Sequence, residues 1–451
     1  MIRKNEIYEL EITDVSSDGN GVASIDGMVV FVPDTITGDK ISARILKVHK
    51  TYAYAKAEEI IKESSHRCSA LCREFGKCGG CDFQHINYEY QLEIKKGIIE
   101  NAVKRIGRLE CGVDEMLGAE KIHRYRNKMI FPVGSGRDGA VQCGFYRERS
   151  HDIIPLDDCL LGGEFNGAVI SAVKEYMEKF NVQPYDEKTH RGTVRRIFTR
   201  SGTVSGEIMI VISANAEKLP QEEELVRELV KISPNIKSII LNINKARTNL
   251  VLGRENRTLF GEGRICDELL GVRYEISPHS FFQINHAQTE RLYSRALEYA
   301  EISETDTVMD IYCGIGTISL SAAALAKKVI GVEIVPQAIE DAKKNARENR
   351  ISNAEFYCAD AAELVPELIK NGERPSVVIL DPPRKGSDEN TLGAIVSAEP
   401  KRIVYVSCNP ATLARDLRFL GDNGYKAEKI AGVDMFPNTV HVETVVLLSQ
   451  Q

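Results

Sequence analysis

The spacing of apolar residues changes twice along the chain. Residues 5–61 form short runs in which apolar and polar positions alternate, among them IYELEITDV, GMVVFVP and DKISARILKV, and turns rich in Gly and Asp separate these runs. Short alternating runs of this kind are typical of strands with one buried face. The pattern therefore predicts a small β-barrel over residues 1–62.

The middle of the chain mixes two periods. Residues 87–108 place their apolar side chains on one helical stripe, and helical patterns return at Asn166–Phe180 and Glu222–Lys231. Strand-like runs lie around these helices: RRIFTRS, EIMIVIS and SIILNIN. We predict a central α+β domain over residues 63–270.

From residue 271 to the end, strands alternate with helices. The strand-like runs are TVMDIY, KVIGVEI, AEFYCA, SVVILD and RIVYVS. This alternation predicts a Rossmann-like α/β domain over residues 271–451, with a parallel sheet covered on both faces by helices. EKIAGVDMF and HVETVVLLS, joined through Pro437 and Asn438, are predicted to form a final antiparallel edge hairpin. A chain of 451 residues is too long for one core, so a multidomain protein is expected.

The composition is that of an ordinary globular protein. Hydrophobic residues make up 43% and charged residues 27%, and no apolar run is long enough for a transmembrane helix. The first residues lack the apolar core of a signal peptide, so we expect a cytoplasmic protein with no membrane partner. In that compartment the eleven cysteines are expected to be unpaired, and any cluster of them indicates metal binding or catalysis.

Basic residues gather in two stretches although the net charge is −7. The second half of the predicted barrel interleaves basic and aromatic side chains, which suits RNA but equally fits a solvated face. Its members are Lys40, Arg44, Lys47, Lys50, Tyr52, Tyr54 and Lys56. In residues 121–149, three cations fall on alternate positions, so a strand would turn them to one face, where we favour contact with an RNA backbone over solvation alone. The members of this stretch are Arg124, Arg126, Lys128, Arg137, Tyr146, Arg147 and Arg149.

Three cysteines lie close together in a stretch rich in glycine. Cys72, Cys78 and Cys81 have C-x5-C-x2-C spacing, and two glycines fill the last gap. Glycine allows a backbone to fold tightly around a metal centre. Three close thiolates and one remote thiolate can hold an iron–sulfur cluster, while four thiolates can also hold zinc. The candidates for the fourth ligand are Cys68, Cys111, Cys143 and Cys159. The bland alternative is a set of scattered buried thiols.

A glycine loop follows the first strand of the C-terminal domain. It contains Gly314 and Gly316, and an acid, Glu333, ends the second strand about 20 residues later. A ligand can approach the backbone closely at such a loop, and an acid at this position can bind ribose hydroxyls. Because the loop has no basic cradle for phosphates, S-adenosylmethionine is favoured over a dinucleotide. Asp360, after the third strand, is expected either to face the adenine or to cap a helix.

Two later strands end in residues that can carry chemistry. Asp381 is followed by two prolines, which cannot continue a strand, and Cys408 lies between a strand and the start of a helix. A helix N-terminus lowers the pKa of a thiol, so Cys408 is expected to be a nucleophile, although a lone cysteine is usually an inert buried thiol. Glu443 is the candidate partner base, against the bland reading of a surface glutamate.

Taken together, these motifs resemble the RNA (uracil-C5)-methyltransferases, and specifically those that methylate ribosomal RNA and carry an iron–sulfur cluster. The resemblance covers nearly the whole chain, and the predicted barrel is similar to a TRAM domain. The matching segments are SPHSFFQIN (277–285), DIYCGIGT, GVEIV, DPPRKG, SCNPATLARD and HVETV.

The resemblance implies a role for each matched residue. S-adenosylmethionine would contact Gln283, Tyr312, Glu333 and Asp381; a 4Fe–4S cluster would be held by Cys72, Cys78, Cys81 and Cys159; and catalysis would use Cys408 as nucleophile and Glu443 as base. The implied activity is methylation of uracil C5 in 23S ribosomal RNA, with no protein partner required. Transfer RNA as the substrate, and an RNA-binding protein of this fold that does not methylate, remain the alternatives.

Overall fold

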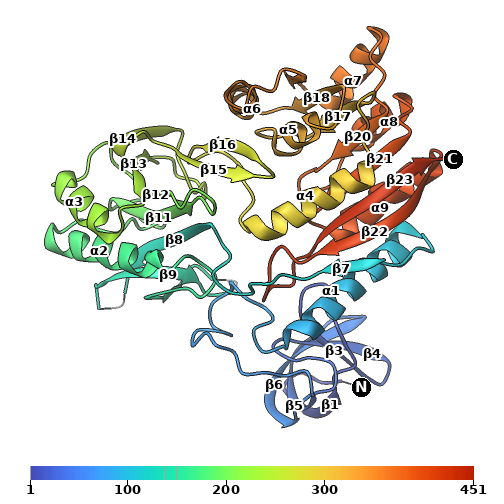
Figure 1. Ribbon diagram of the computed structural model, residues 1–451. Coiled ribbons are helices and arrows are strands. Elements are labelled where there is room, and N and C mark those ends of the chain that lie inside the picture. The colour runs from blue at the N-terminus through green and yellow to red at the C-terminus, as the bar shows by residue number, and fades with distance from the viewer. Residues whose placement is uncertain (1, 137, 149) are drawn as a thin grey trace.

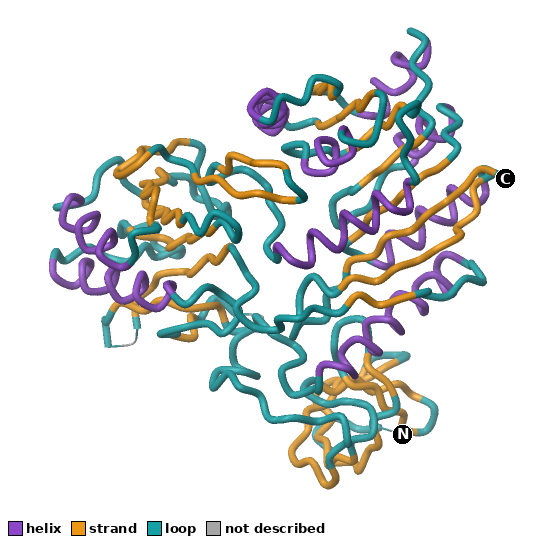
Figure 2. The backbone as a smooth tube through the Cα atoms, viewed as in Figure 1, coloured by secondary structure: helices purple, strands orange, loops and turns teal. Residues whose placement is uncertain are grey.

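The computed structural model describes residues 2–136, 138–148 and 150–451. Figure 1 shows three parts: the N-terminal strands at the bottom in blue, a second sheet at the left in green, and the C-terminal sheet at the right in orange and red. Figure 2 shows mostly loop between the N-terminal strands and helix α1 (Tyr88–Ala102), in the stretch that carries three of the predicted ligand cysteines. No helix of the described chain is long and apolar enough to cross a membrane.

The N-terminal strands form one strongly curved six-stranded sheet in the order β1-β5-β6-β4-β3-β2. Every second residue points inward, as the alternating pattern predicted; Val30, Ile41 and Ala53 have no exposed surface. The outer face carries a cluster of rings in which Tyr52 contacts Phe31 and His49. The strands are β1 (Ile7–Glu11), β2 (Asp14–Val15), β3 (Gly21–Ile25), β4 (Met28–Val32), β5 (Lys40–Val48) and β6 (Tyr52–Lys62).

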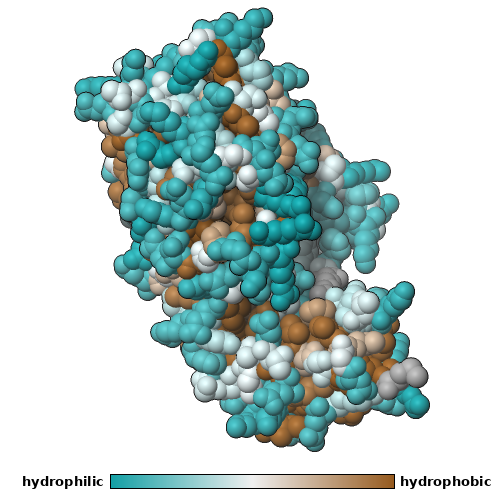
Figure 3. Space-filling model, turned by 90° about the vertical axis from the view of Figure 1, so that its right-hand side faces the viewer, coloured by the Kyte–Doolittle hydropathy of each residue, from teal (hydrophilic) through white to brown (hydrophobic). Residues whose placement is uncertain are grey.

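Apolar side chains are also exposed over this N-terminal sheet. Figure 3 shows a mainly hydrophilic face with hydrophobic side chains gathered toward its lower end, at the height of the N-terminal strands. The exposed large apolar residues of these strands are Ile7, Val29, Leu46, Val48 and Ile61.

The second sheet has seven strands in the order β10-β9-β8-β11-β12-β13-β14. Its strands are β8 (Lys128–Ser135), β9 (Val141–Tyr146), β10 (Ile153–Pro155), β11 (Val194–Ser201), β12 (Ile208–Ala214), β13 (Ile236–Ile243) and β14 (Glu255–Gly261). Helices α2 (Phe165–Lys179) and α3 (Glu222–Ile232) pack on it and share its core, and both lie within one residue of the predicted helices. The hairpin β15 (Ile265–Leu269) and β16 (Val272–Ile276) follows.

The C-terminal sheet has the order β19-β18-β17-β20-β21-β23-β22-β7, and its first five strands are parallel. Its strands in chain order are β7 (Glu115–Leu117), β17 (Thr307–Ile311), β18 (Lys328–Glu333), β19 (Ala354–Cys358), β20 (Val377–Leu380), β21 (Arg402–Ser407), β22 (Tyr425–Val433) and β23 (Glu443–Gln450). The helices are α4 (His286–Ala300), α5 (Thr317–Ala323), α6 (Pro336–Glu348), α7 (Ala361–Lys370), α8 (Glu389–Ser397) and α9 (Pro410–Asp422). This is the Rossmann-like sheet that the alternation predicted.

Successive residues of these strands enter different cores. Val308, Val377 and Val404 pack toward α4, α5 and α6, whereas Met309 and Val378 pack toward α7, α8 and α9. Both faces of the sheet are therefore buried, which is why its strands read as continuous apolar runs.

One prediction about the edge of this sheet is wrong. The antiparallel hairpin of β22 and β23 forms as expected, but it is not at the edge, because the short strand β7 (Glu115–Leu117) pairs with β22 in parallel. Helix α1 and the π-helical turn η1 (Val103–Gly107), which continues it, pack against α9. Part of the stretch predicted as a central domain, residues 63–270, thus belongs to the C-terminal sheet, because the apolar side of α1 is buried there.

Candidate active site

Four predicted site residues lie along one edge of the C-terminal sheet. Tyr312 follows β17, Glu333 ends β18, Asp381 follows β20 and Cys408 follows β21. These four strands are neighbours in the order β18-β17-β20-β21, and all are parallel. Their carboxyl ends therefore meet at one edge, the position at which open α/β sheets bind ligands.

Strand pairing brings Glu443 to the same edge. β23 runs antiparallel to β21, and Ser407 pairs with Thr444, so the next residues along each strand, Cys408 and Glu443, lie across from each other. Directly opposed residues in antiparallel strands have Cα atoms about 4.5–5.5 Å apart. Glu443 is 3% exposed, while Cys408 is half-buried at the end of its strand. A shielded carboxyl group and a more accessible thiol thus face one site.

Burial and neighbouring carboxylates raise the pKa values of the groups at this edge. Burial raises the pKa of Glu443 to about 8, with the Asp381 carboxylate adding to the rise, and burial alone raises the pKa of Asp381 to about 7. The pKa of the Cys408 thiol rises to about 11, first through burial and then through the charges of Glu443 and Asp381. The prediction of a lowered pKa at Cys408 is therefore wrong, because burial and two carboxylates outweigh the helix N-terminus.

The opposing cation is Arg384, a residue that the sequence reasoning passed over. Its charge lowers the pKa of both Cys408 and Glu443. The first residues of α9 fix its backbone: Asn409 Nδ2 and Thr412 Oγ1 donate to the Arg384 carbonyl oxygen at 3.1 and 3.2 Å. The signal was present in the sequence, because Arg384 belongs to the same DPPR segment as Asp381.

The Arg384 side chain is in turn held by a histidine. Arg384 Nη2 lies 3.2 Å from His441 Nε2, two residues before Glu443. Burial lowers the pKa of His441 to about 4, and the charge of Arg384 adds to this effect. The imidazole is therefore neutral near pH 7 and can accept a hydrogen bond from the guanidinium.

The glycine loop after β17 leaves room for a ligand. Gly314 and Gly316 have φ of +54° and +84°, and a Cβ built on Gly314 would meet nothing within 4 Å. The Glu333 carboxylate accepts the Gly314 N–H at 3.3 Å and the Val335 N–H at 3.0 Å, so the loop itself orients the acid. The Tyr312 hydroxyl lies 3.0 Å from Ser387 Oγ. These residues fit the ribose and adenine ends of S-adenosylmethionine.

A second acid at this loop was also missed. Asp310 is 1% exposed, and burial raises the pKa of its carboxyl group to about 7. Ser319 donates to Oδ2 at 2.5 Å, while Oδ1 is buried and has no hydrogen-bond partner among the described residues. An unpaired buried acceptor beside the glycine loop fits the amino group of an amino-acid cofactor. Its position at the end of β17 was the available signal.

The other two predicted contacts differ in what surrounds them. Gln283 is half-buried. Its backbone carbonyl oxygen accepts a hydrogen bond from Asn127 Nδ2 at 2.8 Å, which ties the loop of Gln283 to the residue before β8. Asp360 caps α7 by accepting the Ala362 N–H at 2.9 Å. Of the two expectations for Asp360, the structure thus shows the helix cap.

The four predicted ligand cysteines lie in one region. Cys72 and Cys159 act electrostatically on Cys78, Cys159 acts on Cys81, and Cys72 acts on Cys159. The four thiols nevertheless do not form a compact metal-binding group within the described residues. The Gln84 side chain joins two of them, since its Nε2 donates to Cys81 Sγ at 3.2 Å and its Oε1 accepts the Cys72 N–H at 3.1 Å.

Burial favours the neutral form of the thiols in this region. Burial raises the pKa of Cys78 and Cys159, and raises that of Cys81 to about 12, so thiolates there need a metal to be stable. A Cβ on Gly80 would come within 3.3 Å of Cys78 Sγ, so glycine lets the loop close around the sulfur.

The predicted face of alternating cations does not form. β8 begins only at Lys128, and Arg124, with φ of +54°, lies before it. The Arg124 guanidinium binds Asp158 Oδ2 at 2.5 Å and the Cys159 carbonyl oxygen at 2.9 Å, so this cation supports the segment that carries Cys159. Two further members of the predicted patch, Arg137 and Arg149, lie outside the described residues.

Known proteins resemble the chain over its whole length. A family profile described as tRNA (Uracil-5-)-methyltransferase matches residues 201–451, and a TRAM-domain profile matches residues 3–57. An RNA methyltransferase of Clostridium tetani, described as uncharacterized, is 45% identical over 448 residues, which cover 99% of this chain and 97% of that protein. An equivalent protein of Listeria monocytogenes is 45% identical over 448 residues, covering 99% of this chain and 98% of that protein.

A solved structure is similar as well. The Pyrococcus abyssi tRNA (uracil-54, C5)-methyltransferase in complex with S-adenosyl-L-homocysteine has a TM-score of 0.79 and 29% identity, covering 98% of this chain and 100% of that chain. With the family profile, this supports S-adenosylmethionine as the cofactor. The chain therefore belongs to the tRNA (uracil-5-)-methyltransferase family and is an RNA methyltransferase with an N-terminal TRAM domain.

Proposed function

We propose that this enzyme methylates C5 of a uracil in RNA through a covalent adduct, with Cys408 as nucleophile and Glu443 as base. The observation that carries the proposal is the pairing of Ser407 with Thr444, which sets the Cys408 thiol and the buried Glu443 carboxyl group across from each other. Uracil C5 is too weak a nucleophile to take a methyl group unaided, so covalent activation is needed.

The reaction passes through three stages at the uracil. Cys408 sulfur adds to C6, and the electron pair of the C5–C6 double bond moves into the enolate of C4 and C5. C5 then takes the methyl group, which S-adenosylmethionine supplies in electrophilic form when bound. Finally Glu443 removes the C5 proton, the C5–C6 double bond forms again, and the sulfur–C6 bond breaks to release Cys408. The uracil must leave its stack to reach the thiol, so the base is flipped.

The electrostatics of the site set the protonation states from which Cys408 and Glu443 start. Cys408 begins as a neutral thiol, so its proton passes to solvent water as the sulfur adds to C6, and Arg384 favours the charged state of the sulfur. Glu443 has a pKa of about 8, close to the working pH, as an efficient general base requires. We assign cofactor binding to Gln283, Tyr312, Glu333 and Asp381, with Asp310 as a further contact.

We also propose that Cys72, Cys78, Cys81 and Cys159 hold a 4Fe–4S cluster. The C-x5-C-x2-C spacing, the family resemblance of the four-cysteine motif and the tight loop at Gly80 support this proposal, although the four thiols do not form a compact metal-binding group within the described residues. No step of methyl transfer needs an electron, so the role of the cluster would be structural. It would hold in place residues 72–83, which we call the cysteine loop. Protein purified without oxygen should contain iron and sulfide and absorb visible light, and Cys159→Ser should lose them. Zinc without iron in the wild type would refute the cluster.

For the substrate we propose 23S ribosomal RNA, on the family resemblance of the four-cysteine motif. Transfer RNA is the second candidate, since the Pyrococcus abyssi enzyme of similar structure acts on transfer RNA. The test uses cofactor with a labelled methyl group and separate pools of unmodified ribosomal and transfer RNA, followed by nucleoside analysis. Labelled 5-methyluridine in the ribosomal pool supports the first candidate, and label in the transfer RNA pool alone supports the second.

A further inference from the structure

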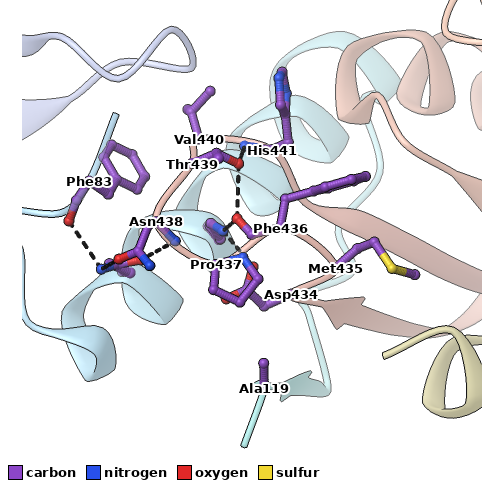
Figure 4. Close-up of polar contacts among 12 residues, drawn as sticks. Phe83, Ala119, Asp434, Met435, Phe436, Pro437, Asn438, Thr439, Val440 and His441 are labelled. Atoms are coloured by element: carbon purple, nitrogen blue, oxygen red, sulfur yellow. Dashed lines mark hydrogen bonds and ion pairs between the residues drawn. The ribbon is translucent and has the colours of Figure 1, made fainter. Parts of the chain in front are cut away.

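The loop between β22 and β23 leads directly into the base. It comprises residues 434–442, and Glu443 follows it as the first residue of β23. Figure 4 shows this loop with Phe83 beside it and with hydrogen bonds at Asn438 and within the loop itself. Asn438 has φ of +67° and is 3% exposed, so a buried backbone in an unusual conformation precedes the catalytic strand. Such a conformation persists only where surrounding contacts hold it.

The first half of the loop is anchored to helix α1. Lys95 Nζ donates to Asp434 Oδ1 at 2.5 Å and to the Phe436 carbonyl oxygen at 3.0 Å, and both charged side chains are fully buried. Tyr88 donates its hydroxyl hydrogen to Asp434 Oδ2 at 2.8 Å. These bonds hold the end of β22 without the cysteine loop.

The second half of the loop is anchored to the cysteine loop. Asp82 follows Cys81 directly, and the backbone N–H groups of Asp82 and Phe83 both donate to the Asn438 carbonyl oxygen, at 2.9 and 3.0 Å. The Asp82 carboxylate accepts the Val440 N–H at 2.9 Å through Oδ2. Gln91 completes the contact, because its Oε1 accepts the Asn438 N–H at 3.0 Å.

We propose that Asp82 is a positioning residue for Glu443: by holding the Val440 N–H, it connects the cysteine loop to the segment that carries the base. Val440 precedes His441, the partner of Arg384, and stands three residues before Glu443. A shift at Val440 is therefore passed along the chain to the base, whereas Asn409 and Thr412 hold the backbone of Arg384 independently. The inference rests on the proposed function, since it concerns how the proposed base is aligned.

The contact pattern predicts which step is affected. Cys408 and the cofactor loop follow β21 and β17, and among the described residues no hydrogen bond or ion pair joins Asp82 to either segment, so addition to C6 and methyl transfer depend little on it. Proton removal needs Glu443 within hydrogen-bond reach of C5, and misplacing a base by about 1 Å can cost about a hundredfold in rate. Loss of the Asp82 contact should therefore trap the methylated adduct.

The test compares Asp82→Ala and Asp82→Asn in the full-length protein under single-turnover conditions, with the labelled cofactor and the RNA pool that the wild type methylates. Denaturing gels measure RNA bound covalently to protein, nucleoside analysis measures released 5-methyluridine, and thermal unfolding monitors the fold. Asp186→Ala is the matched control, because Asp186 also accepts backbone N–H groups, at Lys188 and Thr189, but lies in an exposed loop away from the site.

Asp82→Ala should form the adduct at nearly the wild-type rate and release 5-methyluridine ten- to a hundredfold more slowly. Asp82→Asn, whose amide oxygen can still accept the Val440 N–H, should restore most of the release rate, and Asp186→Ala should match the wild type. The inference is refuted if Asp82→Ala releases product at the wild-type rate, or if adduct formation and release slow by the same factor. If the wild type itself forms no 5-methyluridine, the proposed function fails instead.

Discussion

The pKa of Glu443 predicts how fast the methylated RNA leaves the enzyme at each pH. Burial raises this pKa to about 8 from an ordinary value of 4.5, and only the ionised carboxylate can take the C5 proton. The ionised fraction is about 1% at pH 6, about 10% at pH 7 and about one half at pH 8. Release should therefore be about fiftyfold faster at pH 8 than at pH 6 and should level off above pH 8.

A pH jump isolates this step from the ionisation of the thiol. The adduct is formed at pH 6 with the labelled cofactor, where release is slow, and is then transferred to buffers between pH 5 and pH 9. Loss of protein-bound RNA is followed by denaturing gel. Cys408 is already bonded to C6 at this stage, so its own pKa of about 11 does not enter.

Two results would refute the reasoning. A release rate that stays constant between pH 6 and pH 8 would mean that Glu443 is not the base, or that it is ionised throughout that range. A rate that levels off by about pH 5 would mean that Glu443 titrates as an exposed glutamate does. Cys408→Ala, which cannot form the adduct, controls for RNA that remains bound without a covalent bond.

Three further predictions concern single positions. Lys95→Met leaves the buried Asp434 without its cation and should lower the free energy of unfolding by about 3–5 kcal/mol in a denaturant titration. Lys96→Met, which breaks only an exposed ion pair, should lower it by less than about 1 kcal/mol. Gly316→Ala places a Cβ 3.1 Å from the Phe356 ring on a residue with φ of +84°, and should weaken cofactor binding, measured by calorimetry, about tenfold. Gly372→Ala is the control: its residue has φ of +96° but open space around it, and cofactor binding should be unchanged. Because the pKa of Glu443 is raised in the folded state, the wild type loses stability as pH rises from about 4.5 to about 8. Glu443→Gln should therefore unfold at a higher temperature than the wild type at pH 8, and the difference should close toward pH 4. A difference that is larger at low pH would contradict the assignment.

Periodicity predicted most of the fold because the strands and helices bury regular faces. Strand β21 and helix α9 were found on either side of Cys408, and the carboxyl-end rule correctly brought Tyr312, Glu333, Asp381 and Cys408 to one edge. The motif HVETV located Glu443, and strand register then explains why it meets Cys408.

What the sequence could not predict depends on contacts between distant segments. The three residues of β7 carry no strand signal of their own, and they become a strand only by pairing with β22, more than 300 positions later. The raised pKa of Cys408 follows first from its burial and then from two carboxylates on other segments, none of which local sequence specifies. Arg124 looked like one of a row of exposed cations, but Asp158 and the Cys159 carbonyl oxygen bind it instead.

The central claim is that Cys408 bonds covalently to uracil C6 and that Glu443 resolves the adduct. The most direct measurement is mass spectrometry of the Glu443→Gln protein after reaction with RNA and the cofactor. The RNA and then the protein are digested before the peptides are analysed. We predict a mass increase of one methylated uridine fragment on the peptide that contains Cys408, and no increase in the Cys408→Ala, Glu443→Gln double variant. An unmodified Cys408 peptide, from an enzyme preparation whose wild type makes 5-methyluridine, would contradict the covalent mechanism.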